Sequence, residues 1–370
     1  MNDNIKNVGF NFDNTYANLS ESLISHVKPE LSKDPKLIIL NDNLGKNLDL
    51  NFEHLNEKEI SSLLSGNSLP RGSQSIAQAY AGHQFGFLTM LGDGRATLIG
   101  EHLNKKNERF DIQLKGSGKT PFSRNGDGRA TLLSMLREYL ISEAMNGLNI
   151  PTTRSLAVVS TGENVFREKI YNGGILTRVA SSHIRVGTFQ NLSMRGDYKT
   201  LGNLISYSLK RHFAHYPSDT NSAISLLKIV RDKQISLIVN WMRVGFIHGV
   251  MNTDNMAISG ETIDYGPCAF MNAYNPNKYF SSIDKNGRYS FINQSIIAHW
   301  NISRFAETLI PFLNPSRTKA IDIGKEIIND FEDLYKKKWH KMMKDKLGFL
   351  DENKDDDKLI NELLNWMEKN

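Results

Sequence analysis

The order in which strand-like and helix-like segments follow one another constrains the fold of this chain most. From Gln74 to about Phe189 the sequence is dense in glycine and turn residues. Short segments there predict strands: Ala96–Gly100, Phe110–Leu114 and Ile175–Val179. Residues 200–330 instead predict mostly helix, with a long apolar stretch over 222–244 that Gly245 should end. A strand-rich part followed by a helical part favours an α+β fold.

One helix is predicted inside the strand-rich part, from about Arg129 to Met145. Four residues mark one of its faces at helical spacing: Leu133, Leu136, Leu140 and Ala144. Its other faces also carry apolar residues, so we expect this helix to be well buried.

Composition and charge narrow the classes of protein that the chain can be. Its 18 Phe, 12 Tyr and 4 Trp need a core, which excludes a disordered chain. No run of about 18 apolar residues is present and the N-terminus lacks an apolar signal core, so we expect a cytoplasmic protein without a membrane partner. The formal charge of +5 suits an anionic ligand, whether nucleotide, phosphate or nucleic acid, and is too small to decide among them. The basic residues are dispersed, except at Lys336–Lys338, whereas nucleic-acid-binding proteins more often carry a Lys/Arg stripe or block. The single Cys268 excludes an internal disulfide.

A seven-residue repeat, GDGRATL, occurs at Gly92–Leu98 and again at Gly126–Leu132. Seven identical residues argue against chance. The repeat predicts either two similar tight turns or two anion-binding turns, in which backbone N–H groups and a neighbouring arginine face a phosphate. We favour anion-binding turns, because Gly, Asp and Arg together supply what a phosphate contact needs.

Lys115 ends a predicted strand, and Glu138 follows in the predicted helix. The segment Gly116–Thr120 ends like a phosphate-binding P-loop, but Gln113 stands where that motif needs its first glycine. A buried carboxylate is costly unless it is paired. Lys115 and Glu138 are therefore expected to form the strand–helix ion pair that positions ATP phosphates in protein kinases.

The second half of the chain contains a motif of the kind that kinases use beside this ion pair. It reads HGVMNTDN from His248 and is followed by IDYG from Ile263. Kinases carry H-x-D-x-x-x-x-N and then D-F-G. When the histidines are aligned, Asn255 and Asp264 fall on the two metal ligands, and Val250 falls on the catalytic base.

Valine accepts no proton, so the kinase base is missing and Asp254 is the nearest replacement. An amide oxygen and a carboxylate across a loop suit a Mg²⁺ ion that keeps water and phosphate ligands. The plainer alternative is a polar turn before a strand. Between the two halves, Arg178 and Arg185 are candidates for phosphate contacts or for structural ion pairs.

Several strings of this sequence resemble the selenoprotein O family of pseudokinases. They occur in the family's order from about residue 75 to about residue 305: YAGHQFG (Tyr80–Gly86), LGDGRA (Leu91–Ala96), DIQLKGSG (Asp111–Gly118), NGDGRATL (Asn125–Leu132), REYLISEAM (Arg137–Met145), IPTTR (Ile150–Arg154), HGVMNTDNM (His248–Met256) and IDYGP (Ile263–Pro267).

The resemblance implies a protein-kinase-like bilobed fold, with a small β-rich nucleotide lobe and a mainly helical second lobe. It also implies that ATP binds in an inverted orientation and that AMP, rather than phosphate, is transferred to Ser, Thr or Tyr hydroxyls of proteins. Some members use UTP similarly. Asp254 then resembles the proton acceptor, Asn255 and Asp264 the ligands of Mg²⁺ or Mn²⁺, and Glu138 the partner of Lys115. The implied nucleotide contacts are Gly92, Gly94, Arg95, Lys115, Asp127, Gly128, Arg178, Arg185 and Asp264.

On this basis the chain is divided into four segments. Residues 1–75 form a lead-in of short helices and loops, 76–190 the nucleotide-binding lobe, 191–320 the helical lobe with its catalytic and metal-binding loops, and 321–370 a charged helical tail. Family members continue beyond the point where this chain stops, so we expect a shortened C-terminus. Other functions stay open: a kinase-type phosphotransferase with Asp254 as base, a non-catalytic nucleotide-binding regulator and, least favoured, a nucleic-acid-binding protein.

Overall fold

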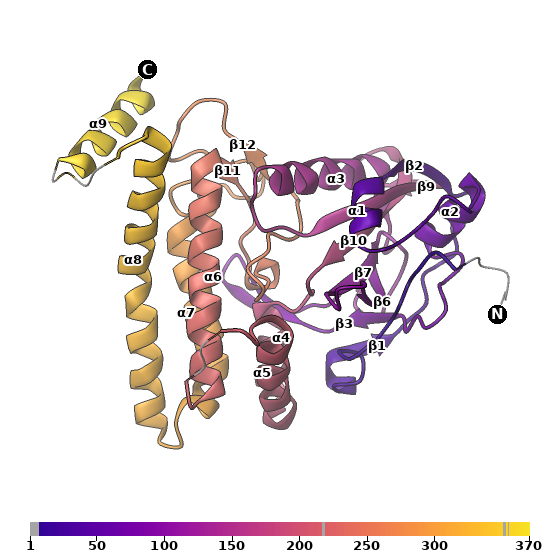
Figure 1. Cartoon of the computed structure of the whole chain (residues 1–370), viewed down its shortest axis with the longest axis horizontal. Coiled ribbons are helices and arrows are strands. Elements are labelled where there is room, and N and C mark those ends of the chain that lie inside the picture. The colour runs from indigo at the N-terminus through magenta and orange to yellow at the C-terminus, as the bar shows by residue number, and fades with distance from the viewer. Residues whose placement is uncertain (1–6, 217–218, 351–352, 354) are drawn as a thin grey trace.

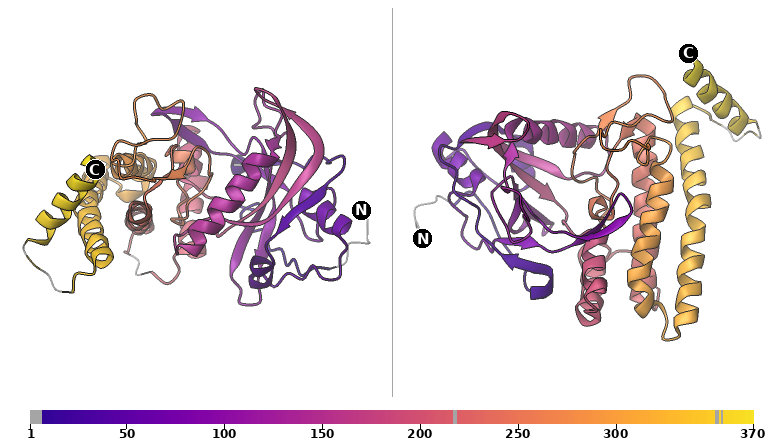
Figure 2. Two further views of the ribbon diagram at one scale, coloured as in Figure 1. Left: turned by 90° about the horizontal axis from the view of Figure 1, so that it is seen from above. Right: turned by 180° about the vertical axis from the view of Figure 1, so that it is seen from behind.

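The computed structural model describes residues 7–216, 219–350, 353 and 355–370 (Figure 1). Strands dominate up to Ala180 and helices dominate beyond it, as predicted for an α+β fold. Figure 2 shows the same division in two further views, with the sheet toward one end of the molecule and the long helices toward the other. None of the helices in these ranges is long and apolar enough to cross a membrane.

Within the described residues, eight strands form the main sheet, and its neighbouring strands pair antiparallel. The order is β1-β3-β6-β7-β10-β9-β2, and β8 pairs with β10. The bounds are β1 Ile24–His26, β2 Lys36–Leu40, β3 Ile76–Gln78, β6 Ala96–Leu103, β7 Arg109–Lys115, β8 Ala130–Thr131, β9 Arg154–Phe166 and β10 Ile170–Ala180. The strands predicted from sequence at β6, β7 and β10 are confirmed.

Along β7 and β10, apolar and polar side chains alternate, so the sheet has one apolar face and one charged face. One face packs on the helices α1 (Asp42–Asn47) and α2 (Glu57–Ser65) through Ile112, Leu114, Ile175 and Val179. Because successive side chains of a strand point to opposite faces, the polar residues between them share the other face. That face carries Asp111, Gln113, Lys115 and Arg178.

The helix predicted at Arg129–Met145 is α3 (Leu132–Gly147), which packs against β9 and β10. The prediction that its leucine-rich face is buried is wrong, because Leu133 and Leu140 are 68% and 69% exposed to solvent. The face that packs on the sheet instead carries Met135, Glu138, Ser142 and Met145. The spacing of the leucines indicated the wrong buried face, because the side of the helix that faces the charged side of the sheet carries the Glu138 carboxylate and not a leucine.

Residues 1–75 contain α1 and α2, as expected, and also the strands β1 and β2, which their weak periodicity did not predict. Both strands belong to the main sheet, at its two edges. Leucines of α1 and α2 join the apolar core beneath β7 and β10. The lead-in segment is therefore part of the folded sheet structure.

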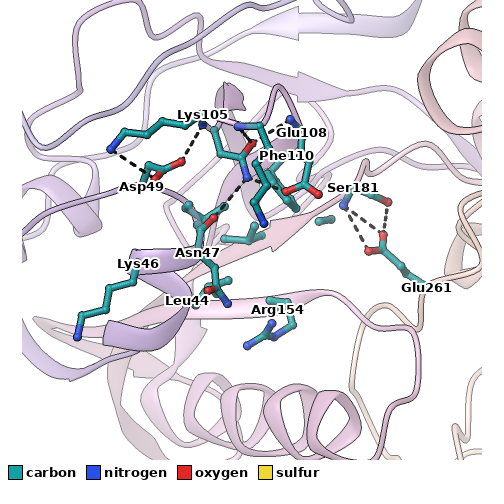
Figure 3. A pocket seen from close by; sticks show the side chains of 15 residues that line it. Leu44, Lys46, Asn47, Asp49, Lys105, Glu108, Phe110, Arg154, Ser181 and Glu261 are labelled. Carbon is teal, nitrogen blue, oxygen red and sulfur yellow. Dashed lines mark hydrogen bonds and ion pairs between the residues drawn. The ribbon is translucent and has the colours of Figure 1, made fainter.

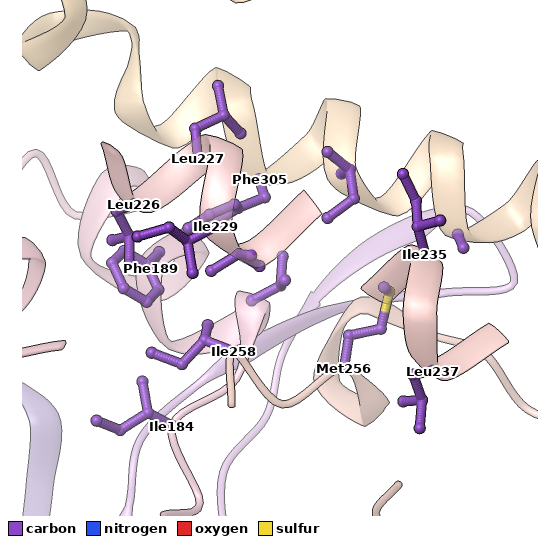
Figure 4. Packing of buried hydrophobic residues seen from close by; sticks show 14 of the residues in the cluster. Ile184, Phe189, Leu226, Leu227, Ile229, Ile235, Leu237, Met256, Ile258 and Phe305 are labelled. Carbon is purple, nitrogen blue, oxygen red and sulfur yellow. The ribbon is translucent and has the colours of Figure 1, made fainter. Parts of the chain in front are cut away.

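The helical part is built around α6 (Ser222–Val244), which packs against α7 (Gln294–Leu313) and α8 (Arg317–Leu347). As predicted, α6 ends at Gly245, which takes a left-handed conformation. The shorter helices are α4 (Val186–Met194), α5 (Tyr198–His212) and α9 (Asp356–Lys369). Figure 4 shows side chains of this core, where Phe189 of α4 meets Phe305 of α7 edge to face.

A buried charge network ties α5 to the sheet. Arg211 near the end of α5 places Nη2 2.6 Å from Asp111 Oδ1 on β7, and its Nη1 contacts Glu101 on β6. Tyr207 donates a hydrogen bond of 2.9 Å to Glu101, and His183 Nδ1 lies 2.9 Å from the other oxygen of Asp111. Arg211 is thus the cation that compensates two buried carboxylates of the sheet.

Replacing Arg211 with methionine should lower the free energy of unfolding by about 3–5 kcal/mol, because it leaves two carboxylates buried without their counter-charge. Urea titrations measure the loss. Lys210→Met is the matched control, since Lys210 is its exposed neighbour on the same helix, and it should stay close to wild type. A loss for Arg211→Met no larger than that of the control would contradict this role.

Acid should also destabilise the fold. Burial lowers the pKa of His183 to about 4 and that of His212 to about 3. The unfolded chain, whose histidines titrate near pH 6.5, then binds more protons, so the free energy of unfolding should fall as the pH drops from about 7 toward 4. In urea titrations at several pH values, His183→Gln should flatten this dependence and the exposed His215→Gln should not. An unchanged slope in His183→Gln would count against this account.

Candidate active site

The residues predicted from sequence meet in one cavity of about 920 Å³. It is lined by both GDG turns, by α3 and by the loop 250–267. Every predicted site residue lines it except Arg185, which lies buried beside Asp264. Seven basic side chains line the cavity against five acidic ones. This excess of positive charge suits a polyphosphate ligand.

Three cations share the carboxylate of Asp264. Lys115 Nζ and Arg178 Nη1 lie 2.7 and 2.6 Å from its Oδ1, and Arg185 Nη1 lies 3.1 Å from its Oδ2. Burial alone would raise the pKa of Asp264, but the three cations hold it well below its ordinary value. The carboxylate is therefore ionised, and its side chain is still 24% exposed.

Glu138 supplies the second carboxylate of this cluster. Its Oε2 lies 2.6 Å from Lys115 Nζ, and its Oε1 lies 3.3 Å from Arg178 Nη1. The structure thus brings together the strand lysine and the helix glutamate that the sequence predicted as a pair. Gln113 lies two residues before Lys115 on β7. Its side-chain oxygen accepts two hydrogen bonds from the Arg178 guanidinium and so fixes the orientation of that guanidinium.

The two copies of the repeat do not form equivalent turns. In the first, the buried Asp93 accepts hydrogen bonds of 3.1 Å from Gln78 N and from Gln113 Nε2. In the second, Asp127 is paired with Arg167 at 2.8 Å. The Phe122 ring packs over the first turn so closely that a side chain at Gly92 would overlap it. Both aspartates line the cavity, but the first also joins β3 to β7 through these hydrogen bonds, whereas the second pairs with Arg167.

Asp254 belongs to a 3-10 turn, η2 (Thr253–Asn255). It is buried, and its Oδ1 accepts a hydrogen bond of 2.8 Å from Gln84 Nε2. Burial raises the pKa of Asp254 to about 6. A carboxyl group of that pKa is largely ionised at neutral pH and is still basic enough to accept a proton.

Asn255 and Asp264 could hold a metal ion. Asn255 donates its amide to Val250 O at 2.9 Å, which leaves its side-chain oxygen available as a ligand. A carboxylate has about four lone-pair positions, and three are used on Asp264. In the described part of the chain, no group of three or more His, Cys, Asp or Glu could hold a metal. The two residues therefore fit an ion that completes its shell with phosphate and water oxygens.

Several lining residues were not predicted from the sequence. Arg167 lies at the tip of the β9–β10 hairpin, and no motif surrounds it in the sequence. Arg124 and Arg137 also line the cavity. Gln84 lies within the string YAGHQFG, but nothing in the string points to a contact with Asp254.

A second cavity, of about 530 Å³, lies between α1, the β6–β7 turn and the end of β10 (Figure 3). It contains none of the predicted residues. Its carboxylates already have partners: Asp49 accepts from the backbone of Lys105, Glu108 from Asn104 and Glu261 from Ser181. Its groups do not converge on a reacting centre, so the larger cavity is the candidate active site.

Comparison with known proteins agrees with this geometry. Residues 6–370 match the family model of the protein adenylyltransferase SelO. The chain is 57% identical to a protein nucleotidyltransferase YdiU of Pelagibacter ubique, 56% to that of Brevibacillus brevis and 53% to that of Nitrosococcus oceani. Each match covers 98% of this chain and 74–75% of the relative.

These relatives are named as nucleotidyltransferases, which is at odds with the term pseudokinase that the family resemblance brought with it. The family model spans nearly the whole chain, and the relatives are more than half identical to it. The chain therefore belongs to the family of the protein adenylyltransferase SelO.

Proposed function

We propose that this chain is a metal-dependent protein nucleotidyltransferase with a protein-kinase-like bilobed fold. It transfers AMP from ATP, or UMP from UTP, to Ser, Thr or Tyr hydroxyls of target proteins. The observation that carries the proposal is the position of Asp254. The kinase base is replaced by Val250, and Asp254 lies in the same cavity as the Lys115 and Asp264 cluster.

In the proposed reaction, the target hydroxyl gives its proton to Asp254 while its oxygen attacks the α-phosphorus of ATP. The bond from that phosphorus to the bridging oxygen breaks, and pyrophosphate leaves. Lys115, Arg178 and Arg185 offset the negative charge that develops on the phosphates. A Mg²⁺ or Mn²⁺ ion held by Asn255 and Asp264 supplies Lewis-acid polarisation of the phosphate oxygens when it is bound.

Incubation with ATP labelled at the α-phosphate should label acceptor proteins, whereas label at the γ-phosphate should not be retained. Asp254→Asn should lower the rate by about 10²–10⁴-fold, because it removes the general base and keeps the shape of the side chain. Intact-mass spectrometry of a labelled acceptor identifies the added group as AMP or phosphate, and competition with UTP measures donor preference.

Asp219→Asn is the matched control, since this half-exposed carboxylate does not line the cavity. It should label acceptors at the wild-type rate. Retention of the γ-label instead would favour the phosphotransferase, and binding of ATP without retention of either label would favour the non-catalytic regulator.

Removal of divalent metal with a chelator should abolish transfer, and added Mg²⁺ or Mn²⁺ should restore it. Asp264→Asn should raise the metal concentration for half-maximal transfer at least about 10-fold, because it weakens a ligand of the ion. Titration of the initial rate with each metal measures this. Asp254→Asn, assayed by calorimetry with MgATP, should bind the nucleotide like wild type. Full activity in excess chelator would be incompatible with the proposal.

A further inference from the structure

A small hairpin reaches from the sheet to the loop that carries Asp254. It consists of β4 (Ala81–Gln84) and β5 (Phe87–Met90), which connect β3 to β6. Three consecutive loop residues accept hydrogen bonds from it. His83 N donates to Thr253 Oγ1 at 2.8 Å, Phe85 N donates to Asn252 Oδ1 at 3.1 Å, and Gln84 Nε2 donates to Asp254 Oδ1 at 2.8 Å.

The hairpin packs so closely on the loop and on α4 that a side chain would not fit at two glycine positions. A Cβ added to Gly82 would lie 2.1 Å from Asp254 Oδ1, and one added to Gly187 of α4 would lie 1.9 Å from Ala81 O. Real Cβ atoms essentially never approach other atoms below 3.0 Å. Glycine at these two positions is therefore what allows the hairpin to lie directly against the Asp254 carboxylate.

The loop is also held from its other side. Thr253 donates a hydrogen bond of 2.6 Å to Gln190 Oε1 on α4, and Tyr289 donates one of 2.6 Å to Asn252 Oδ1. Two backbone N–H groups of the hairpin already fix it to this loop. The Gln84 side chain is thus not needed to dock the hairpin, and its contact with Asp254 calls for a separate explanation.

Among the described residues, Gln84 is the one other side chain that hydrogen-bonds to the Asp254 carboxylate. An ionised carboxylate only accepts hydrogen bonds, so the amide nitrogen of Gln84 must face it. This bond occupies Oδ1, and no side chain of the described residues donates a hydrogen bond to Oδ2. The two oxygens of the proton acceptor are therefore not equivalent.

We propose that Gln84 is a positioning residue, which holds Oδ1 of Asp254 so that Oδ2 faces the target hydroxyl and accepts its proton. The inference rests on the proposed function of Asp254. The hydrogen bond fixes the rotation of the carboxylate, and a misplacement of about 1 Å in a reacting group can lower a rate about 100-fold. Gln84 acts through Asp254 and needs no contact with the nucleotide.

The test compares Gln84→Ala, Gln84→Met and Thr89→Ala in the 370-residue chain. Initial rates are measured with α-labelled ATP, Mg²⁺ and a fixed heat-cleared bacterial lysate as the mixture of acceptor proteins. Gln84→Ala and Gln84→Met should each lower kcat by about 10–100-fold, with the KM for ATP and the melting temperature unchanged. Thr89→Ala on the same hairpin should match wild type, since within the described residues the Thr89 hydroxyl hydrogen-bonds to Phe87 O of its own strand and not to the loop.

Gln84→Met tests whether the hydrogen bond or only the bulk of the side chain matters, because it keeps the length of the side chain and has neither a donor nor a charge. Wild-type kcat in Gln84→Met would overturn the inference, as would a change confined to the KM for ATP. In an Asp254→Asn background, Gln84→Ala should cause no further loss, and a full additional loss would also overturn it. Absence of label with the wild-type chain would instead refute the proposed function itself, which distinguishes the two failures.

Discussion

The carboxylate of Asp264 is the point on which the geometry of the site depends. Its three cations come from β7, from β10 and from the residue that caps α4. One side chain thus joins two strands, a helix and the loop after β11. Removing any partner would leave a buried charge uncompensated, at a cost of several kcal/mol. The cluster therefore specifies how the sheet and the helical part are placed relative to each other.

The charges within this cluster nearly cancel one another. At its centre, Lys115, Arg178 and Arg185 are matched by Glu138, Asp264 and the nearby Asp93, so this buried centre is close to neutral. The positive excess comes instead from arginines at other positions of the lining, such as Arg95, Arg124 and Arg137. A nucleotide would thus meet an already oriented set of donors, and the unmatched arginines would provide the long-range attraction for its phosphates.

The sequence predicted those parts of the site that follow from local rules. The alternation of apolar and polar residues along β7 places Lys115 on the charged face of the sheet. Alignment with the kinase motifs indicates Asn255 and Asp264 as the candidate metal ligands. The apolar face of α3 was mispredicted, because periodicity records where leucines recur and not which face a buried ion pair requires. Gln84 and Asp254 are 170 positions apart, and Arg167 and Asp127 are 40 apart. Such contacts depend on how the hairpins fold back, which no local pattern encodes.

In the proposed function the proton acceptor lies at position 254 and not at position 250, so different residues must support it. His248 keeps a structural role, since its ring bonds to Ile263 O and stacks on Trp241. Arg185 Nη1 donates to the backbone carbonyl of Asp254 at 3.0 Å and to Asp264 Oδ2 at 3.1 Å. One guanidinium therefore sets the spacing between the proposed base and the proposed metal ligand. Arg185 thus holds the backbone of Asp254, and the β4–β5 hairpin holds its side chain. With Asp254 held in this way, the site does not need a carboxylate at position 250.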